Sequence, residues 1–240
     1  MSSSSILEVI AVDVADARAA EAGGADRIEL VSAMSEGGLT PSMGIIEQVV
    51  GSVSIPVYVM IRPHSRSFCY TPADVQAMAR DVRVAKELGA SGIVIGALSG
   101  SGEADLLSLR ECMACAEGMG ITFHRAFDAS TSLTRALLAI SKFPSIERVL
   151  TSGGRRTAPE AAAELKQLME LGRKLQVGVM AGAGMTVDSI HSFVRQTGVT
   201  ELHFGSGVRP GGSFGLPVDP KLVVEAKRRL AEAAREIHIN

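Results

Sequence analysis

The segment TFHRAFD, at residues 122–128, sets three side chains that can handle protons or charge close together. His124, Arg125 and Asp128 follow a short apolar run within it. An imidazole near a carboxylate can act as a general acid or base around neutral pH. The alternative is that Asp128 only caps or braces the loop, since short spacings between His and Asp are common by chance. By itself, the segment leaves both roles open.

Three short segments rich in glycine could bind an anion: TSGGRR, MAGAGM and GSGVR. Glycine lets backbone N–H groups approach a ligand closely, and the N-terminus of a helix favours negative charge. The candidate ligand-binding residues in these segments are Ser152, Gly153, Gly182, Gly184 and Ser206. The alternative is that tight turns simply require glycine.

A repeating pattern along the chain predicts the elements that position these residues. Stretches rich in alanine end in glycine, and a β-branched run follows within a few residues, as in GADRIEL, GASGIVI and GVTELHF. Glycine suits the left-handed residue that ends a helix. Strands that alternate with helices pair in parallel, because the helix forms the crossover between them.

Eight such units fit in the 240 residues and predict an α/β fold, a single (β/α)8 TIM barrel whose sites lie at the C-terminal ends of the strands. We expect one domain over residues 1–240, with residues 1–5 as a flexible tail. Strands are predicted at 6–12, 26–31, 56–62, 91–96, 121–125, 147–152, 176–182 and 200–205. Helices are predicted at 14–22, 42–52, 72–88, 105–118, 132–142, 158–172, 186–197 and 219–236.

Side chains alternate between the two faces of a strand, and this alternation points an unusual set of charged side chains towards the interior of the predicted barrel. In the first strand, Leu7 and Val9 suit the helix layer, so Glu8 and Ile10 point inward. The same reasoning places further side chains inside the barrel: Arg27, Glu29, Val31, Tyr58, Met60, Arg62, Thr122, His124, Glu201 and His203. Barrel interiors are usually apolar, and a buried charge is costly unless it is paired or used.

These interior charges have a structural and a functional explanation. Arg27, Glu29 and Glu201 could form a layer of ion pairs, although Glu29 is also a candidate ligand-binding residue, as is Arg125. Other interior charges lie nearer the C-terminal strand ends, where barrel sites are built, and for them we favour function. The candidate catalytic residues are Glu8, Arg62, His124, Asp128 and His203.

Composition excludes some classes of function for this protein. The formal net charge of −2 and pI of about 6.2 predict no surface for nucleic acid. No apolar run approaches the roughly 20 residues that cross a bilayer, and the start MSSSS lacks the features of a signal peptide. Cys69, Cys112 and Cys115 favour reduced thiols in a cytoplasm. Because Cys112 and Cys115 share a helix with an apolar stripe, we expect them to pack in the core rather than bind metal.

Several segments, in order along the chain, resemble the CutC family of copper homeostasis proteins. They are EV at 8–9, GGADRIEL at 23–30, EGGLTPS at 36–42, IRP at 61–63, TFHRAFD at 122–128, RVLTSG at 148–153 and MAGAG at 180–184. The resemblance runs from about residue 6 to about residue 205. It implies a (β/α)8 barrel that is cytoplasmic in bacteria, often oligomeric, and linked to copper handling and Cu(I) binding.

The resemblance also identifies where this chain departs from the family. Copper binding in some members is ascribed to two cysteines, near the ends of the first and second strands. This chain has Ile10 and Val31 at the matching positions, and neither side chain can bind a metal. Cys69 matches a cysteine of some members and, beside His64, is a candidate metal ligand.

Two functions remain open. One is a copper-binding or copper-tolerance protein that holds Cu(I). The other is an isomerase, lyase or hydrolase that acts on a small anionic or phosphorylated metabolite. In that enzyme Arg62 and the glycine loops bind the anion, and His124 moves protons with Asp128 or Glu8. The basic loop at 62–70 could be a lid over the site or a subunit contact in a homo-oligomer.

Overall fold

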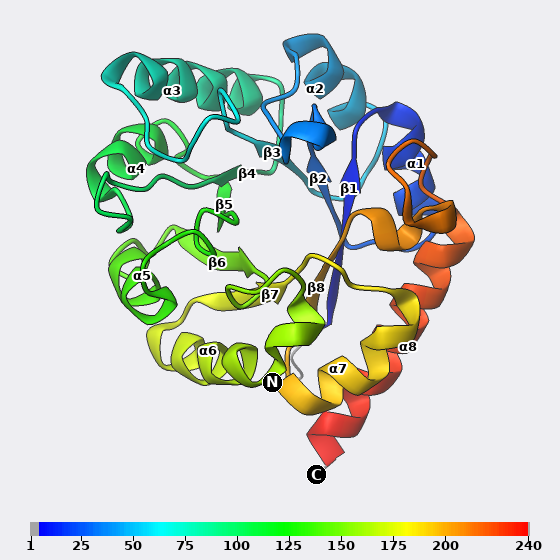
Figure 1. Cartoon of the computed structure of the whole chain (residues 1–240). Coiled ribbons are helices and arrows are strands. Elements are labelled where there is room, and N and C mark those ends of the chain that lie inside the picture. Colours follow the sequence, from blue (N-terminus) through cyan, green and yellow to red (C-terminus); the bar gives the residue numbers. More distant parts are fainter. Residues whose placement is uncertain (1–4, 240) are drawn as a thin grey trace.

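Eight parallel strands pair in chain order and close on themselves, β8 against β1, in this computed structural model (Figure 1). The structure describes residues 5–239, so residues 1–4 of the predicted tail lie outside the described residues. The strands are β1 Ile6–Ala11, β2 Arg27–Leu30, β3 Val57–Met60, β4 Gly92–Ile95, β5 Gly120–Phe123, β6 Ile146–Thr151, β7 Gly178–Ala181 and β8 Glu201–Phe204. The predicted (β/α)8 fold is confirmed.

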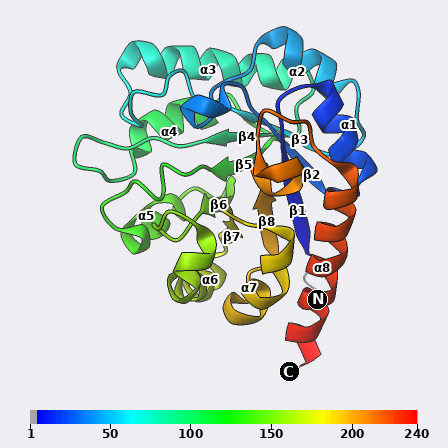
Figure 2. The same cartoon turned by 45° about the vertical axis from the view of Figure 1, so that its right-hand side comes forward.

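A ring of α-helices surrounds the barrel, and the last helix closes the ring by packing against the first (Figure 2). The helices are α1 Val14–Ala22, α2 Met43–Val50, α3 Pro72–Glu87, α4 Leu106–Met113, α5 Leu133–Ile140, α6 Ala162–Leu175, α7 Ile190–Thr197 and α8 Pro220–Ile239. Side-chain caps begin many of them, for example Asp13 before α1 and Thr71 before α3. Such caps satisfy backbone N–H groups that have no partner within the helix.

Three predicted helices differ from the structure by at least four residues at one end, and one of them, expected at 186–197, begins only at Ile190 as α7. The helix expected at 105–118 is only α4, and turns follow it. The helix expected at 158–172 begins later, as α6, and continues past Gly172. A Cβ on Gly172 would lie 2.5 Å from the carbonyl oxygen of Val177, so this glycine allows close packing instead of ending the helix. Gln176 ends α6 in the left-handed conformation, with φ at 58°.

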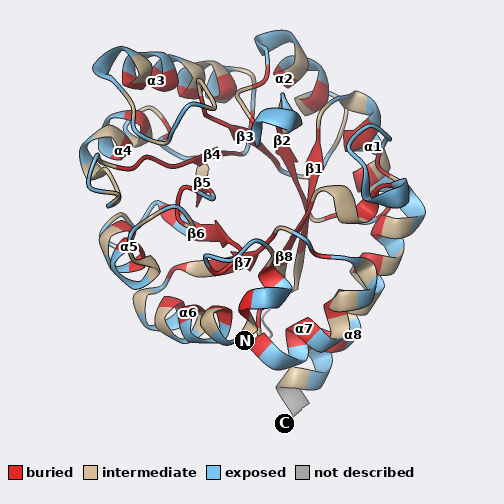
Figure 3. Ribbon diagram, in the orientation of Figure 1, coloured by how far each residue is buried: buried red, intermediate tan, exposed pale blue. Residues whose placement is uncertain are grey.

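The barrel strands are largely buried (Figure 3), and they separate two apolar regions, as the alternation predicts. Leu7, Val9 and their equivalents pack against the helices in the large outer core. A smaller cluster lies on the opposite strand faces, inside the barrel: Ile10, Val31, Tyr58, Met60 and Val94. Six of the seven charged side chains predicted to be inside are also buried, among them Glu8, Arg27 and Glu29, whereas Glu201 is only partly buried. None of the helices described here is both long and apolar enough to cross a membrane.

Candidate active site

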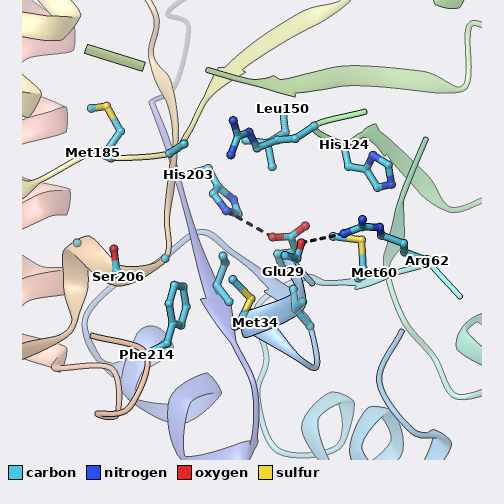
Figure 4. A pocket seen from close by; sticks show the side chains of 18 of the residues that line it. Glu29, Met34, Met60, Arg62, His124, Leu150, Met185, His203, Ser206 and Phe214 are labelled. Atoms are coloured by element: carbon cyan, nitrogen blue, oxygen red, sulfur yellow. Dashed lines mark hydrogen bonds and ion pairs between the residues drawn. The ribbon is translucent and has the colours of Figure 1, made fainter. Parts of the chain in front are cut away.

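A cavity of about 290 Å³ opens at the C-terminal ends of the strands (Figure 4). Seven of the predicted site residues line it: Glu29, Arg62, His124, Arg125, Gly184, His203 and Ser206. They come from β2, from the segments after β3, β5 and β7, and from β8 and the segment after it. Five others do not line it: Glu8, Asp128, Ser152, Gly153 and Gly182.

Beneath the cavity, charged side chains form a continuous chain of ion pairs inside the barrel. Arg27 bridges Glu8 and, at 3.7 Å, Glu201. Glu201 also pairs with Arg148 at 3.0 Å. Burial alone would raise the pKa of Glu8, but the charges and hydrogen bonds of Arg27 and His203 lower it to about 2. Arg27 and Glu201 therefore belong to the predicted ion-pair layer, and Glu8 joins that layer to the cavity.

Glu29 and His203 form the upper end of this chain and line the cavity. His203 Nδ1 lies 2.7 Å from a Glu8 carboxylate oxygen, and His203 Nε2 lies 3.4 Å from Glu29 Oε2. Burial and the nearby Glu8 charge raise the pKa of Glu29 to about 7, against the opposing effect of His203 and Arg27. Burial opposes the charged imidazole, yet Glu29 and Glu8 raise the pKa of His203 above its ordinary value. Glu29 can therefore gain and lose a proton near neutral pH, with the His203 ring beside it.

His124 is a neutral imidazole with one nitrogen free in the cavity wall. Burial, followed by the charge of Arg62, lowers its pKa to about 3. Its Nδ1 accepts a hydrogen bond of 3.1 Å from the backbone N–H of Ala126, so the ring proton is assigned to Nε2. Nε2 is buried and has no hydrogen-bond partner within the described chain. His124 thus offers an N–H donor without a positive charge.

The ring of His124 depends on a glycine that the sequence analysis missed. A Cβ on Gly96 would lie 2.5 Å from His124 Nδ1 and 2.7 Å from its Cε1. Such a contact is far shorter than packed carbon and nitrogen atoms allow, and the imidazole is buried. Gly96 directly follows β4, but nothing in the sequence around it distinguishes it from the glycines of ordinary turns.

Arg62 is a buried cation that no carboxylate neutralises among residues 5–237. Its Nη1 donates to the carbonyl oxygens of Glu36, Gly37 and Gly38, and its Nη2 to that of Ser65, over 3.2–3.4 Å. The guanidinium carbon lies 4.6 Å from the centre of the Phe68 ring. Its Nε is buried and makes none of these hydrogen bonds, and the Tyr70 hydroxyl lies near the same guanidinium. Because a buried cation is stabilised by an opposite charge, Arg62 marks a place for an anion.

Asp128 braces the loop after β6 instead of contacting His124. It accepts hydrogen bonds from Thr151 Oγ1 and from the backbone N–H groups of Ser152 and Gly154, at 2.5–3.1 Å. Arg125 Nε completes the group at 2.8 Å. The structure therefore does not bring Asp128 to His124 as a proton partner, because its oxygens face the neighbouring loop. Of the two roles left open by the sequence, bracing matches this geometry.

The glycine-rich segments contribute space more than anion contacts. A Cβ on Gly182 would lie 2.7 Å from Leu150 and 3.1 Å from His203, so Gly182 gives the His203 ring its room. Gly153 has a φ of 71° in the turn after β6. Gly184 and Ser206 do line the cavity.

Three described side chains lie close enough together to share a metal ion: Glu8, Glu29 and His203, with ligand atoms within 4.8 Å of one another. Glu8 is already engaged by Arg27 and His203. Oxygen and imidazole donors also suit hard or borderline cations better than Cu(I), which prefers thiolate and thioether sulfur.

The cysteines lie outside the cavity. Cys69 is exposed, and its thiol donates to the Ser99 carbonyl oxygen at 3.3 Å. Cys112 is buried in the outer core, as predicted, and burial raises its pKa to about 12. Cys115 packs at the edge of the same core. Among the described residues that line it, the cavity therefore offers no thiolate for Cu(I), and only the thioethers of Met34, Met60 and Met185 provide soft sulfur.

Sequence comparison places this barrel among known proteins. The model of the CutC family matches residues 5–208. The chain belongs to the CutC family. It is 44% identical over 211 residues to a CutC family protein of Rhizobium meliloti, covering 88% of this chain and 85% of the relative. A CutC family protein of Caulobacter vibrioides is 44% identical over 219 residues, covering 90% and 85%.

Solved structures agree with this assignment. A CutC protein of Streptococcus agalactiae, whose link to copper homeostasis is provisional, superposes with a TM-score of 0.78 at 26% identity, covering 84% of this chain and 98% of that one. Thiamine phosphate pyrophosphorylase from Pyrococcus furiosus superposes with a TM-score of 0.64 at 17% identity, covering 95% of this chain and 96% of that one. The second likeness shows the fold alone.

Proposed function

We propose that this CutC protein is an enzyme that binds a small anionic carbonyl compound and moves a proton at the carbon beside the carbonyl group. One observation carries the proposal. Three buried polar atoms without a hydrogen-bond partner, Glu29 Oε1, Arg62 Nε and His124 Nε2, belong to side chains that line one cavity. Each such atom costs about 1–3 kcal/mol when left unpaired. A ligand that pairs with all three would remove this cost.

Arg62 binds the negative group of the substrate. It is the cavity-lining cation that no carboxylate neutralises, whereas Arg125 is paired with Asp128 at 2.8 Å. A guanidinium matches the planar fork of a carboxylate and can donate to it from more than one nitrogen. The anion would therefore lie beside Phe68, whose ring supports the guanidinium.

His124 polarises the carbonyl group. Its Nε2–H can donate to the carbonyl oxygen, and it donates more strongly when that oxygen gains negative charge in the transition state. A neutral imidazole serves here because it keeps its proton at the end of the step. The pKa of about 3 ensures that His124 is uncharged at neutral pH. A neutral imidazole donor together with a glutamate base suits proton transfer at a carbon beside a carbonyl group.

Glu29 is the base. Its carboxylate takes the proton from carbon, the C–H electron pair forms a carbon–carbon double bond, and the carbonyl electrons move to the oxygen held by His124. A pKa of about 7 suits a group that must accept and then return a proton at neutral pH. His203, within 3.4 Å of Glu29 and held by Glu8, stabilises the carboxylate between these steps.

The test is proton exchange with solvent, with pyruvate as the smallest enolisable carboxylate probe. In D2O, the protein should accelerate deuterium incorporation into the pyruvate methyl group, measured by proton NMR. Glu29→Gln should lower the acceleration at least about 100-fold, in line with the loss of a general base. The rate should rise with pH through an apparent pKa near 7. Glu87→Gln is the matched control, because that side chain is 64% exposed on α3.

Exchange that persists in Glu29→Gln would refute the proposed role of Glu29. Equal rates with and without the wild-type protein would refute proton transfer to carbon as the function of this cavity.

Cu(I) binding, the function linked to the family by name, is the second candidate. It is favoured by one observation, the three thioethers of Met34, Met60 and Met185 that line the cavity. His124 is poorly suited to join them. A metal on Nε2 would move the ring proton to Nδ1, where it would face the N–H of Ala126.

A further inference from the structure

The walls of the cavity are mainly apolar, apart from the polar groups that carry the proposed chemistry. Six aliphatic and thioether side chains contribute to them: Ile10, Val31, Met34, Met60, Leu150 and Met185. Phe68 and Phe214 add two aromatic rings. A ligand that binds here must cover these surfaces, because burial of apolar area is the main favourable term available.

A sugar phosphate does not match this wall. Each of its hydroxyl groups would need a hydrogen-bond partner once it is buried. Beyond the catalytic groups and Arg125, the cavity offers the Ser206 hydroxyl as its side-chain partner among the described lining residues. Most of the hydroxyls would therefore depend on backbone groups of the lining segments for their partners.

The charges of the cavity favour a single negative charge. Arg62 is free of carboxylates, whereas Arg125 is committed to Asp128. Glu29 lines the same cavity and repels a second negative charge once it is ionised. A carboxylate satisfies Arg62 alone, but a phosphate dianion would keep an unneutralised charge beside Glu29.

The arrangement of the lining residues sets the direction of the ligand. Figure 4 shows Arg62 and His124 on one side, Met185 and Phe214 on the other, and Glu29 and His203 between them. Phe214 is 36% exposed, and its ring has neighbours on its inner side. A Cβ on Gly205 would lie 2.7 Å from this ring and 3.0 Å from Ile10, and the Arg209 guanidinium lies 4.9 Å from the ring centre. A carboxylate at Arg62 would thus direct the rest of the molecule past Glu29 towards Phe214.

The volume of the cavity indicates how large the part of the ligand beyond its carboxylate can be. A cavity of about 150 Å³ lined by apolar side chains is enough to hold benzene. The 290 Å³ measured here leaves room for a ring of that size and a short polar group of a few atoms.

We infer that the substrate is a 2-oxo monocarboxylate with an apolar body of about the size of an aromatic ring, and that Phe214 selects this body. The inference rests on the proposed function and adds the substrate class. In the complex that we infer, the substrate carboxylate binds Arg62, the carbonyl oxygen accepts a hydrogen bond from His124, and the acidic carbon lies beside Glu29. The ring then lies against Phe214, where aromatic contacts add to the burial of apolar area.

The experiment compares phenylpyruvate with pyruvate in the deuterium-exchange assay and uses ribose 5-phosphate as a competitor. We expect kcat/KM for exchange to be at least about tenfold higher for phenylpyruvate than for pyruvate. Phe214→Ala should remove most of this ratio, because the apolar body of phenylpyruvate then loses the ring that it contacts. Leu216→Ala is the matched control, because Leu216 is 47% exposed in the same segment and does not line the cavity. Ribose 5-phosphate should not inhibit.

The outcomes separate the two proposals. If exchange depends on Glu29 but pyruvate reacts as well as phenylpyruvate, the substrate class is wrong and the proposed function stands. The same conclusion follows if ribose 5-phosphate inhibits at a concentration below the KM of both probes. If Phe214→Ala slows both probes equally, Phe214 does not select the body. If neither probe shows exchange that depends on Glu29, both proposals fall. Equal melting temperatures of the two alanine variants would exclude unfolding as the cause.

Discussion

Replacing Glu29 by Gln should change the way stability depends on pH. Glutamine keeps the size of the side chain and mimics the protonated acid. In the folded protein, burial raises the pKa of Glu29 from its ordinary value of 4.5 to about 7. The folded state therefore holds a proton that the unfolded state releases, and this stabilises the wild type below pH 4.5 relative to higher pH. The contribution is lost as the pH rises through about 7.

The magnitude follows from the same pKa. At about 1.4 kcal/mol for each tenfold change in proton affinity, the rise from 4.5 to about 7 corresponds to about 3 kcal/mol. Between pH 4.5 and pH 7, Glu29→Gln should therefore gain about 3 kcal/mol of unfolding free energy relative to the wild type from the loss of Glu29 itself, with a further change from His203, whose raised pKa depends on the Glu29 charge. Carboxylates outside this ion-pair chain titrate in the same way in both proteins. Their contributions therefore cancel when the unfolding free energies of the variant and the wild type are subtracted.

The assay is urea denaturation of both proteins across this pH range, followed by circular dichroism, with Glu87→Gln as the exposed control. The control should keep a constant difference from the wild type. If the wild type and Glu29→Gln also differ by a constant amount from pH 4.5 to pH 7, Glu29 titrates as an ordinary carboxylate. Its carboxyl group would then not be subject to the burial and the Glu8 charge that raise its pKa.

Two further predictions concern the cavity. Gly96→Ala should destabilise the protein by about 1–3 kcal/mol, because its Cβ would lie 2.5 Å from the buried His124 ring, and should abolish exchange. Gly100→Ala, whose Cβ would meet nothing within 4 Å, is the control in thermal melts, and equal melting temperatures would refute the contact. The second prediction concerns Cu(I) affinity, measured by competition with a Cu(I) chelator. Cys69→Ser and His124→Ala should leave any such affinity unchanged. Loss of affinity in either variant would identify that residue as a copper ligand and favour the family's copper role.

The sequence identified part of the candidate site because strand alternation is a local property. Glu8, Arg27, Glu29 and His203 were expected inside the barrel, and the structure buries all of them. Met34 and Phe214 were not found, although they line the cavity. They lie in segments between strands, where no periodic pattern indicates which way a side chain points. The cytoplasmic location and the homo-oligomer stay predictions.

Pairing across the closed barrel decided which of the buried charges meet. Register between β1 and β8 sets Glu8 beside His203, 195 positions away in the chain. Asp128, four residues from His124, faces the loop after β6 because that strand lies next to β5. Sequence by itself determined the fold and the set of charges that point inward. Both follow from strand periodicity and helix ends, which depend on residues close together in the chain. Only the tertiary structure decided the partners, because contacts across the barrel depend on closure and register, which no local pattern contains.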